Sequence, residues 1–259
     1  MRLAGIDLDG TLLRSDGTIS DRSRAAIRKA RAAGITVVIV TARGPMNIRE
    51  VAHDAGITGT AICSNGGLVV DIETGAILKQ RLLQTDIAIA LVHGLRKQVP
   101  GIVFAVEHEL FAHEPGFSAW GWVPPAETRI ADAVDLLADP ATKLILRHAG
   151  HEVEAIAAVA RELAGEAATV VASGGEAVEV TAAGVNKAAA LAEIAEELEI
   201  APADVVAFGD YPNDAAMLAW AGLGVAVANA HAEVLAVADE VTASNDEDGV
   251  ALVLERLSA

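Results

Sequence analysis

The fold is decided by residues 35–41 of this 259-residue chain, Ile35-Thr36-Val37-Val38-Ile39-Val40-Thr41. All of the first six residues are β-branched, and their apolar members follow one another instead of alternating with polar ones. β-Branched residues favour strands, and a strand that is apolar on both faces is typical of a parallel sheet covered by helices on both sides. The segment therefore predicts a buried parallel strand that ends at the hydroxyl group of Thr41.

Helix signals lie on both sides of this strand. Another strand is predicted at residues 3–8, broken by Gly10, and Ser20 can cap a helix that ends near Gly34. After the central strand, a turn at residues 41–44 leads to Pro45, which suits the first position of a helix. These signals predict two successive strand-turn-helix units.

The same alternation returns near the C-terminus. Because β and α elements alternate at both ends of the chain, we expect an α/β protein with a Rossmann-like, doubly wound parallel sheet. Its predicted C-terminal elements are a helix at 186–198, a strand at 205–208, a helix at 212–220, a strand at 223–228, a helix after His231, a strand at 241–242 and a helix from Glu247.

The middle of the chain has a different pattern. Hairpin-type turns occur at residues 65–67 and 73–75, and a helix near 85–99 precedes several short strands. We therefore expect a core made of residues 1–81 and 183–259, interrupted by an α+β insert at 82–182. The predicted strands of the insert lie near 102–106, 142–147, 169–172 and 177–181.

Composition limits the partners. The chain has 36 acidic and 19 basic residues, a formal charge of -17, which argues against binding to nucleic-acid phosphates or to an anionic membrane surface. Hydrophobic residues make up 53% of the chain, as expected of a folded protein. The single cysteine, Cys63, forms no internal disulfide, and no long apolar run is present. We expect a soluble, cytoplasmic monomer or small homo-oligomer.

Polar residues gather where predicted strands end, which is the ligand-binding edge of an open parallel sheet. Asp7 and Asp9 end the first strand, and alternation along a strand would place both carboxylates on the same side, where they repel each other unless a cation or a proton intervenes. Thr41 ends the central strand beside a helix N-terminus that can receive an anion. The sequence thus indicates an acidic site that needs a cation.

Two further features complete the pattern. Lys187 stands in the first turn of a predicted helix, where the helix dipole disfavours a cation unless an anion lies nearby. Residues 209–214, Gly-Asp-Tyr-Pro-Asn-Asp, bring two carboxylates and an amide to another strand end. Taken singly, such features also fit ordinary turns and helix caps. Their combination favours a functional site.

In this order, the features resemble the four motifs of haloacid dehalogenase-like (HAD) phosphohydrolases: Asp-x-Asp-Gly-Thr-Leu at 7–12, the strand ending in Thr41, Lys187, and Gly-Asp-x-x-Asn-Asp at 209–214. The insert resembles, by position and length, the cap of the Cof-type subfamily, also called class IIB. Thr41-Ala42-Arg43 departs from the family's more common Thr-Gly-Arg. Further matching segments are residues 64–67, 224–230 and 242–251.

The resemblance implies a Mg²⁺-dependent phosphatase acting on a small phosphorylated metabolite, such as a sugar phosphate, through an aspartyl-phosphate intermediate. Asp7 would be the nucleophile and Asp9 the general acid and base. The implied phosphate-binding and substrate-binding residues are Thr41, Arg43, Asn65, Lys187 and Asn213. The implied metal ligands are Asp7, Asp9 through its backbone carbonyl, Asp210 and Asp214, the last as a ligand or as support.

Two other functions remain open at this level. A phosphomutase of the same superfamily would use the same aspartyl-phosphate chemistry. A receiver-like phospho-acceptor module also has an acidic pocket with Thr and Lys, but it predicts neither Asp9 nor the large insert. Within the insert, residues 107–109 and 113–114 (Glu-His-Glu and His-Glu) fit a substrate-reading surface or, as we favour, a solvated loop.

Overall fold

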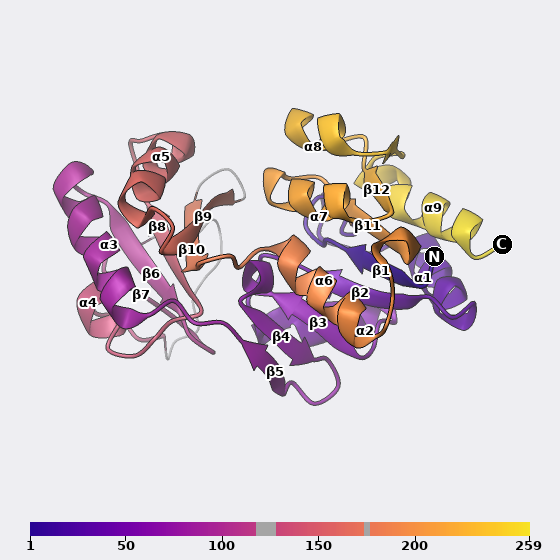
Figure 1. The fold of residues 1–259 in the computed structure, drawn as a ribbon, viewed down its shortest axis with the longest axis horizontal. Helices are drawn as coiled ribbons and strands as arrows, with labels where there is room; N and C mark the ends of the chain where they lie inside the picture. Colours follow the sequence, from indigo (N-terminus) through magenta and orange to yellow (C-terminus); the bar gives the residue numbers. More distant parts are fainter. Residues whose placement is uncertain (118–127, 174–176) are drawn as a thin grey trace. The chain divides into compact units, whose positions relative to one another are not determined.

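The computed structural model describes residues 1–117, 128–173 and 177–259, and the chain divides into two compact units (Figure 1). The core unit combines Met1–Lys79 with Asn186–Ala259, and the insert unit is Gln80–Val185. Among the helices of these described ranges, none is long and apolar enough to cross a membrane.

The core unit is built on an eight-stranded sheet whose order is β13-β12-β11-β1-β2-β3-β4-β5. In its middle, Ile6 of β1 lies opposite Ile39 of β2 and Phe208 of β11, and both pairings are parallel. The sheet is parallel from β13 to β3, whereas β4 runs antiparallel to β3. The strands are β1 (Leu3–Ile6), β2 (Thr36–Val40), β3 (Thr60–Cys63), β4 (Leu68–Asp71), β5 (Ile77–Gln80), β11 (Val205–Gly209), β12 (Leu223–Ala226) and β13 (Glu240–Val241).

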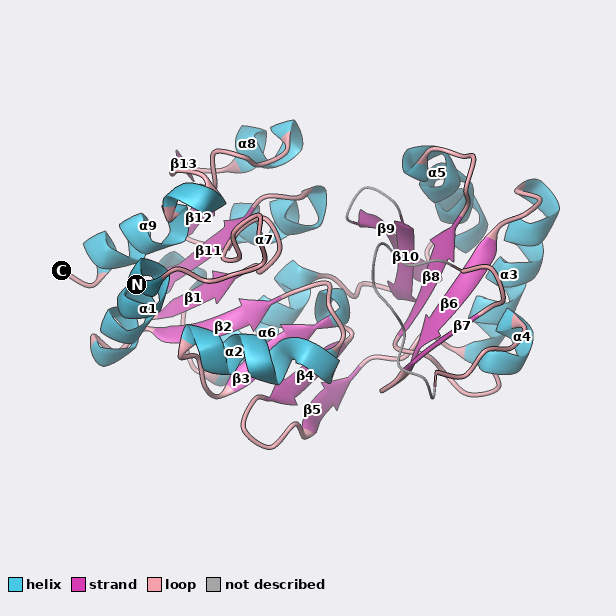
Figure 2. Ribbon diagram, turned by 180° about the vertical axis from the view of Figure 1, so that it is seen from behind, coloured by secondary structure: helices cyan, strands magenta, loops and turns pink. Residues whose placement is uncertain are grey.

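Helices cover both faces of this sheet, which confirms the doubly wound fold (Figure 2). Val37 and Ile39 face the helices α1 (Asp21–Ala32), α2 (Ile48–Ala55) and α9 (Gly249–Leu257). Val38 and Val40 face the other layer, formed by α6 (Lys187–Glu197), α7 (Ala215–Trp220) and α8 (Ala232–Val237). The consecutive apolar residues of β2 are therefore buried alternately on two sides.

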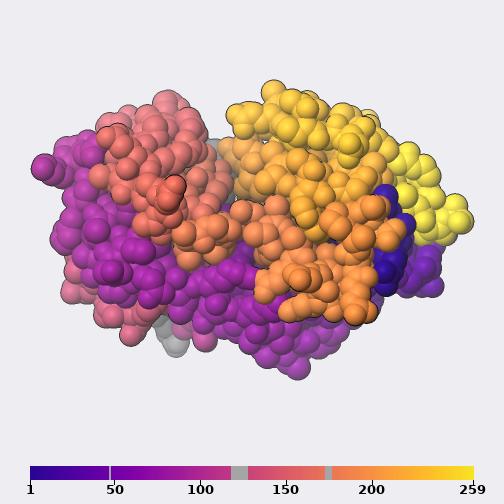
Figure 3. Space-filling model, viewed as in Figure 1, coloured from indigo at the N-terminus to yellow at the C-terminus, as the bar shows by residue number. Residues whose placement is uncertain are grey.

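Local signals explain where several elements begin. Ser20 accepts a hydrogen bond from the Ser23 amide and caps α1, as predicted. Pro45 opens the short 3₁₀ helix η1 (Pro45–Asn47) that leads into α2. The remaining 3₁₀ turns of the core unit are η2 (Ser64–Gly66), η3 (Pro202–Asp204), η4 (Pro212–Asp214) and η5 (Asn245–Glu247). In the space-filling view, the indigo N-terminal residues lie against the yellow C-terminal ones, in agreement with the packing of α1 on α9 (Figure 3).

The insert unit has a separate sheet of order β7-β6-β8-β10-β9, in which the pairs that include β6, β8 and β10 are antiparallel. Helices α3 (Thr85–Gln98), α4 (Ala133–Leu136) and α5 (Val153–Ala164) pack on one face of it. The sequence signals did not predict α4 or α5. The strands are β6 (Val103–Glu107), β7 (Phe111–His113), β8 (Lys143–Arg147), β9 (Ala168–Ser173) and β10 (Ala177–Ala182).

The favoured interpretation of residues 107–109 and 113–114 as a solvated loop is wrong for three of their side chains. Glu107, His113 and Glu114 are each only 7% exposed. Glu114 accepts hydrogen bonds from the backbone amides of Phe104 and Ala133, at 3.0 and 2.9 Å. The carboxylate thus serves a structural purpose, because it satisfies backbone donors that burial removes from water.

Candidate active site

The candidate site lies at the carboxyl edge of the core sheet. Asp7 follows β1, Thr41 follows β2 and Asp210 follows β11, and these three strands are neighbours with β1 in the middle. Because the strands are parallel, their carboxyl ends meet at one edge. The sheet therefore brings together residues that lie more than 200 positions apart in the sequence.

Lys187 is the cation of the site. It is 2% exposed, and its Nζ donates to Asp7 Oδ1 at 2.7 Å and to Asp214 Oδ1 at 2.6 Å. It is the first residue of α6, whose N-cap Asn186 accepts a hydrogen bond from the Ala189 amide. A cation at a helix N-terminus is unfavourable by itself. The two carboxylates supply the nearby anions that the sequence analysis required.

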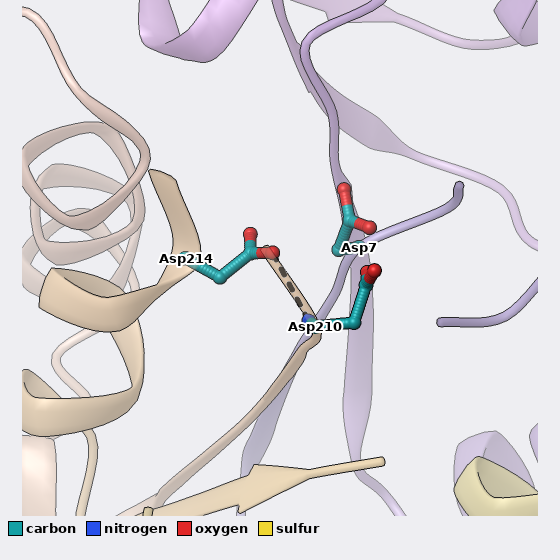
Figure 4. Close-up of side chains that lie close together, drawn as sticks. All are labelled: Asp7, Asp210 and Asp214. Atoms are coloured by element: carbon teal, nitrogen blue, oxygen red, sulfur yellow. Dashed lines mark hydrogen bonds between the residues drawn. The ribbon is translucent and has the colours of Figure 1, made fainter. Parts of the chain in front are cut away.

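Asp214 is held by donors on both of its oxygens. Oδ1 accepts from Lys187, and Oδ2 accepts from the backbone amides of Asp210 and Tyr211 at 3.2 and 3.0 Å (Figure 4). The close packing depends on Gly209, since a Cβ there would lie 2.4 Å from the Cβ of Asp214. Asp214 is therefore a rigid, fully buried support between η4 and Lys187.

Asp7 and Asp210 each accept a hydrogen bond on one oxygen from a neighbouring side chain. Lys187 takes Oδ1 of Asp7, and the Thr11 hydroxyl donates to Oδ1 of Asp210 at 2.7 Å. Oxygens of Asp7, Asp210 and Asp214 lie within 4.8 Å of one another, and the carboxylate of Asp210 points toward Asp7 (Figure 4). If all three carboxylates are ionised, one ammonium leaves two negative charges in excess. Such an oxygen donor set fits a divalent cation, Mg²⁺ included.

The pKa values of these groups reflect their burial. Burial raises the pKa of Asp7 well above its ordinary value, against the effect of the Lys187 ammonium. Burial also raises the pKa of Asp210 to about 6, and the charge of Asp214 adds to the rise while the Thr11 hydrogen bond opposes it. Burial alone would lower the pKa of Lys187, but Asp214 and Asp7 together hold it above its ordinary value. Lys187 is thus a permanent cation.

Asp9 occupies a different environment from Asp7, which corrects the prediction of a strand running through residue 8. β1 ends at Ile6, and the following residues turn, with Gly10 in the left-handed region at φ 79°. The Asp9 side chain is 54% exposed and accepts two hydrogen bonds from one edge of the Arg43 guanidinium, from Nε to Oδ2 at 2.8 Å and from Nη2 to Oδ1. The hydrogen bonds to Asp9 raise the pKa of Arg43. Arg43, expected to face substrate, thus holds Asp9 here.

Thr41, Asn65 and Asn213 form the side of the site next to β2 and β3. The fully buried Thr41 accepts the Asn65 amide on its backbone carbonyl at 3.0 Å, and Asn213 Nδ2 donates to Asn65 Oδ1 at 2.9 Å. Asn65 has a left-handed backbone with φ 56°, a conformation that Asn tolerates better than most residues. Asn213 Oδ1 is buried and has no hydrogen-bond partner among the residues that the structure describes. A buried acceptor of this kind can accept a hydrogen bond from a ligand, or its amide group can rotate so that the NH₂ group takes its place.

One contact escaped the sequence analysis. In the sequence, Thr11 stands out only as part of the Asp-x-Asp-Gly-Thr-Leu motif, yet its hydroxyl orients the Asp210 carboxylate. A hydroxyl residue one position after a turn glycine, near predicted carboxylates, was the available signal. Gly10 itself packs against the same group, because a Cβ there would lie 2.4 Å from Asp210 Oδ2.

A buried acidic cluster with one lysine, at the carboxyl edge of a doubly wound sheet, defines an α/β enzyme that handles an anionic substrate with a cation. The family model described as haloacid dehalogenase-like hydrolase matches residues 5–254. The chain therefore belongs to the haloacid dehalogenase-like hydrolases. Enzymes of this family use a divalent metal, and the acidic cluster fits one.

Individual relatives agree with this assignment. The Bacillus subtilis (strain 168) protein named 5-amino-6-(5-phospho-D-ribitylamino)uracil phosphatase YcsE is 34% identical over 261 residues, which cover 97% of this chain and 93% of that protein. The Escherichia coli (strain K12) protein named Pyridoxal phosphate phosphatase YbhA is 29% identical, with 96% of each chain covered. A crystal structure of a haloacid dehalogenase-like hydrolase from Bacteroides thetaiotaomicron has a TM-score of 0.78 at 26% identity and covers 99% of both chains. The protein is a phosphoric monoester hydrolase of this family.

Replacing Gly10 with alanine should damage the site through a specific clash. Gly10→Ala must displace the Asp210 carboxylate, and misplacement by about 1 Å can lower activity roughly 100-fold. Gly17→Ala is the matched control, because Gly17 has nearly the same φ, 81°, but a Cβ there meets nothing within 4 Å. Phosphatase assays of both variants separate the clash from backbone strain. Equal activity losses in the two variants would contradict the proposed clash.

Removing the charge of Asp210 should stabilise the protein when metal is absent. Because the folded-state pKa of Asp210 is raised to about 6, the stability that its protonated form contributes below pH 4 is lost as the pH rises through 6. In EDTA, Asp210→Asn should match the wild type near pH 4 and exceed its free energy of unfolding by about 1–3 kcal/mol at pH 7.5. Urea unfolding at a series of pH values measures the difference.

Asp71→Asn is the control for this experiment. Hydrogen bonds from Thr74 lower the pKa of the half-buried Asp71, so its replacement should give no gain in stability as the pH rises. A difference between Asp210→Asn and wild type that stays constant with pH would show that Asp210 ionises as readily in the folded protein as in the unfolded chain.

Proposed function

We propose that this enzyme is a Mg²⁺-dependent phosphatase that hydrolyses a small phosphorylated metabolite through an aspartyl-phosphate on Asp7. The observation that carries the proposal is the buried Lys187 ammonium bonded to Asp7 and Asp214, beside the third carboxylate of Asp210. A phosphate dianion cannot approach three carboxylates unless cations offset them. The cluster therefore combines a nucleophile, Asp7, with a cation, Lys187, that offsets negative charge.

Asp7 is the proposed nucleophile because its orientation is already set. Lys187 holds Oδ1 at 2.7 Å and so fixes the direction of the carboxylate that attacks phosphorus. Burial strips water from the carboxylate, and a desolvated, positioned carboxylate is a better nucleophile than a hydrated one. The attack forms the bond between Asp7 and phosphorus and breaks the bond to the leaving oxygen. Water then hydrolyses the aspartyl-phosphate.

Asp9 is the proposed general acid and base. Its exposed carboxyl group protonates the leaving alcohol and then takes a proton from the hydrolytic water. Both Asp9 oxygens are occupied by Arg43 in this structure. Arg43 is also a proposed phosphate-binding residue. An arriving phosphate that attracts Arg43 therefore frees Asp9 to act on the leaving group.

The proposed phosphate-binding residues present donors to the phosphoryl oxygens. They are Thr41 through its hydroxyl, Lys187, Asn65, Asn213 and Arg43. Asn213 needs a rearrangement, because its Nδ2 is bonded to Asn65 while its unpartnered Oδ1 is an acceptor. Rotation of this amide by half a turn presents Nδ2 to phosphate, and the Asn65 amide must then rotate as well so that its Nδ2 donates to Asn213 Oδ1. The buried, unpartnered Oδ1 supports such a change.

Mg²⁺ is the proposed cofactor, held by Asp7, the backbone carbonyl of Asp9 and Asp210. Its chemistry when bound is to neutralise charge on the phosphoryl group. Asp214 is the proposed support or additional ligand, and support fits its contacts better because both of its oxygens already accept hydrogen bonds.

The substrate is proposed to be a small phosphate ester, such as a sugar phosphate. Two relatives are named as phosphatases of 5-amino-6-(5-phospho-D-ribitylamino)uracil and of pyridoxal phosphate, both of them small phosphorylated metabolites. Selection of the leaving group by the insert unit stays a prediction. The phosphatase relatives set aside the receiver-like module, whereas the phosphomutase remains the alternative. Release of inorganic phosphate from hexose monophosphates without a bisphosphate activator would exclude a strict mutase.

Substitution of the nucleophile tests the central step. Asp7→Asn should lower phosphate release by more than about 1,000-fold, since loss of a nucleophile removes the covalent route. The assay is a panel of phosphorylated metabolites with Mg²⁺ and then with EDTA, and EDTA should abolish wild-type turnover. Asp54→Asn makes the same chemical change on the surface, where Asp54 pairs with Arg24, and should keep full activity. Wild-type turnover by Asp7→Asn would disprove the nucleophile assignment.

The net charge of -17 gives an expectation for salt. An anionic protein repels an anionic substrate at long range, and added salt screens that repulsion. Moderate salt at saturating Mg²⁺ should therefore leave kcat/KM unchanged or raise it. A steep fall of kcat/KM with salt would instead indicate a basic approach path to the site.

A further inference from the structure

The turn that carries Asp9 is closed by its own backbone. The amides of Thr11 and Leu13 donate to the carbonyl of Leu8, and the amide of Leu12 donates to the carbonyls of Asp7 and Leu8. Leu8, Leu12 and Leu13 are buried in the core. The N–H groups of Thr11, Leu12 and Leu13 are thus used inside the turn, and the carbonyls of Gly10 and Leu13 accept hydrogen bonds from side chains elsewhere in the chain.

Two asparagine amides from the C-terminal part of the chain bond those carbonyls. Asn229 Nδ2 donates to the carbonyl of Gly10 at 2.8 Å, and Asn245 Nδ2 donates to the carbonyl of Leu13 at 2.9 Å. Asn245 is 7% exposed, whereas Asn229 is exposed. These two bonds hold both ends of the turn between Gly10 and Leu13.

The two asparagines are also bonded to each other. The backbone amide of Asn245 donates to Asn229 Oδ1 at 3.0 Å, so Asn229 uses both ends of its side chain. The Thr242 hydroxyl donates to the carbonyl of Gly249 at 2.9 Å and closes the loop that presents Asn245. A Cβ at Gly249 would lie 2.0 Å from the carbonyl oxygen of Ala243, so the closure needs glycine. Segments 224–230 and 242–251, to which the sequence analysis gave no role, thus meet at the Asp9 turn.

We propose that Asn229 and Asn245 are positioning residues that aim the acid/base carboxyl group of Asp9 at the leaving oxygen. The proposal rests on the acid/base role of Asp9 proposed above. Among the described residues, Arg43 alone bonds the exposed Asp9 side chain, so the direction of this side chain depends on the backbone of the turn once substrate takes Arg43. Proton transfer requires the Asp9 carboxyl group to lie within hydrogen-bond distance of the leaving oxygen. If the turn is loosened, Asp9 lies at that distance in only part of the enzyme–substrate complexes.

Comparing kcat/KM for substrates whose leaving groups differ in basicity gives a readout that a purely structural role of the two asparagines would not change. 4-Nitrophenyl phosphate releases a stable phenolate that needs little protonation, whereas phenyl phosphate releases a more basic one. Because kcat/KM reports the step in which the phenol leaves, loss of a well-aimed acid lowers kcat/KM more for phenyl phosphate. Asp9→Asn should show this selective loss and serves as the reference.

Asn245→Ala and Asn229→Ala should each lower kcat/KM for phenyl phosphate roughly 3- to 10-fold more than for 4-nitrophenyl phosphate. This selective loss is smaller than the full contribution of general acid catalysis, because Asp9 itself is retained. Asn229→Asp keeps the acceptor for the Asn245 amide but loses the donor to Gly10, so it should behave like Asn229→Ala. Asn229 is exposed, so its variants should fold even if Asn245→Ala does not. Ile57→Val, a core change in the segment before β3, should lower Tm by a few degrees and leave the ratio of kcat/KM for the two substrates unchanged.

The outcomes separate the two proposals. Equal losses for both substrates in Asp9→Asn would overturn the acid role of Asp9 and, with it, the proposed mechanism. A selective loss in Asp9→Asn together with equal losses in the Asn229 variants would leave that mechanism standing and overturn the positioning role. If Asn229→Asp kept the wild-type ratio of kcat/KM for the two substrates, the bond from Asn229 to Gly10 would not be what aims Asp9.

Discussion

A lysine ammonium buried among carboxylates is the interaction on which the rest of the structure depends. Removing a charge from water costs several kcal/mol, and Lys187 recovers that cost only through its bonds to Asp7 and Asp214. The three residues come from the end of β1, the start of α6 and the turn η4. The sheet order, the cap of α6 by Asn186 and the close packing at Gly209 all serve to place these three groups together.

The parts of this arrangement that the sequence predicts follow from the regular geometry of strands and helices. Consecutive β-branched residues at 35–40 indicated a parallel strand covered on both faces, and the structure buries them alternately on two sides. Since parallel strands end at one edge, Asp7 and Asp210 were expected to meet, and they do. Lys187 at a helix start required nearby anions, which the fold supplies. Periodicity and strand ends therefore carry information about the site before any contact is known.

The parts that escaped prediction depend on single torsions and on long-range pairing. Alternation along a strand placed Asp7 and Asp9 on one side, but Gly10 at positive φ turns the chain so that Asp9 meets Arg43. No local pattern marks a side-chain amide that bonds a carbonyl 219 positions away, as Asn229 does. In the insert unit, Glu114 looked like a surface residue because its type is usually exposed, yet it satisfies buried backbone amides. Burial is set by tertiary packing, which composition does not encode.

The central position of β1 in the sheet also sets an order of events on the ribosome. β1 pairs with β2 on one side, but its other partner, β11, is synthesised about 200 residues later. Until then the growing chain exposes an unpaired strand edge in the middle of its future sheet, a surface that invites wrong pairing. The insert unit, in contrast, is one continuous stretch of chain and can fold as soon as it emerges. The core is completed only when the C-terminal segment arrives to close around its first residues.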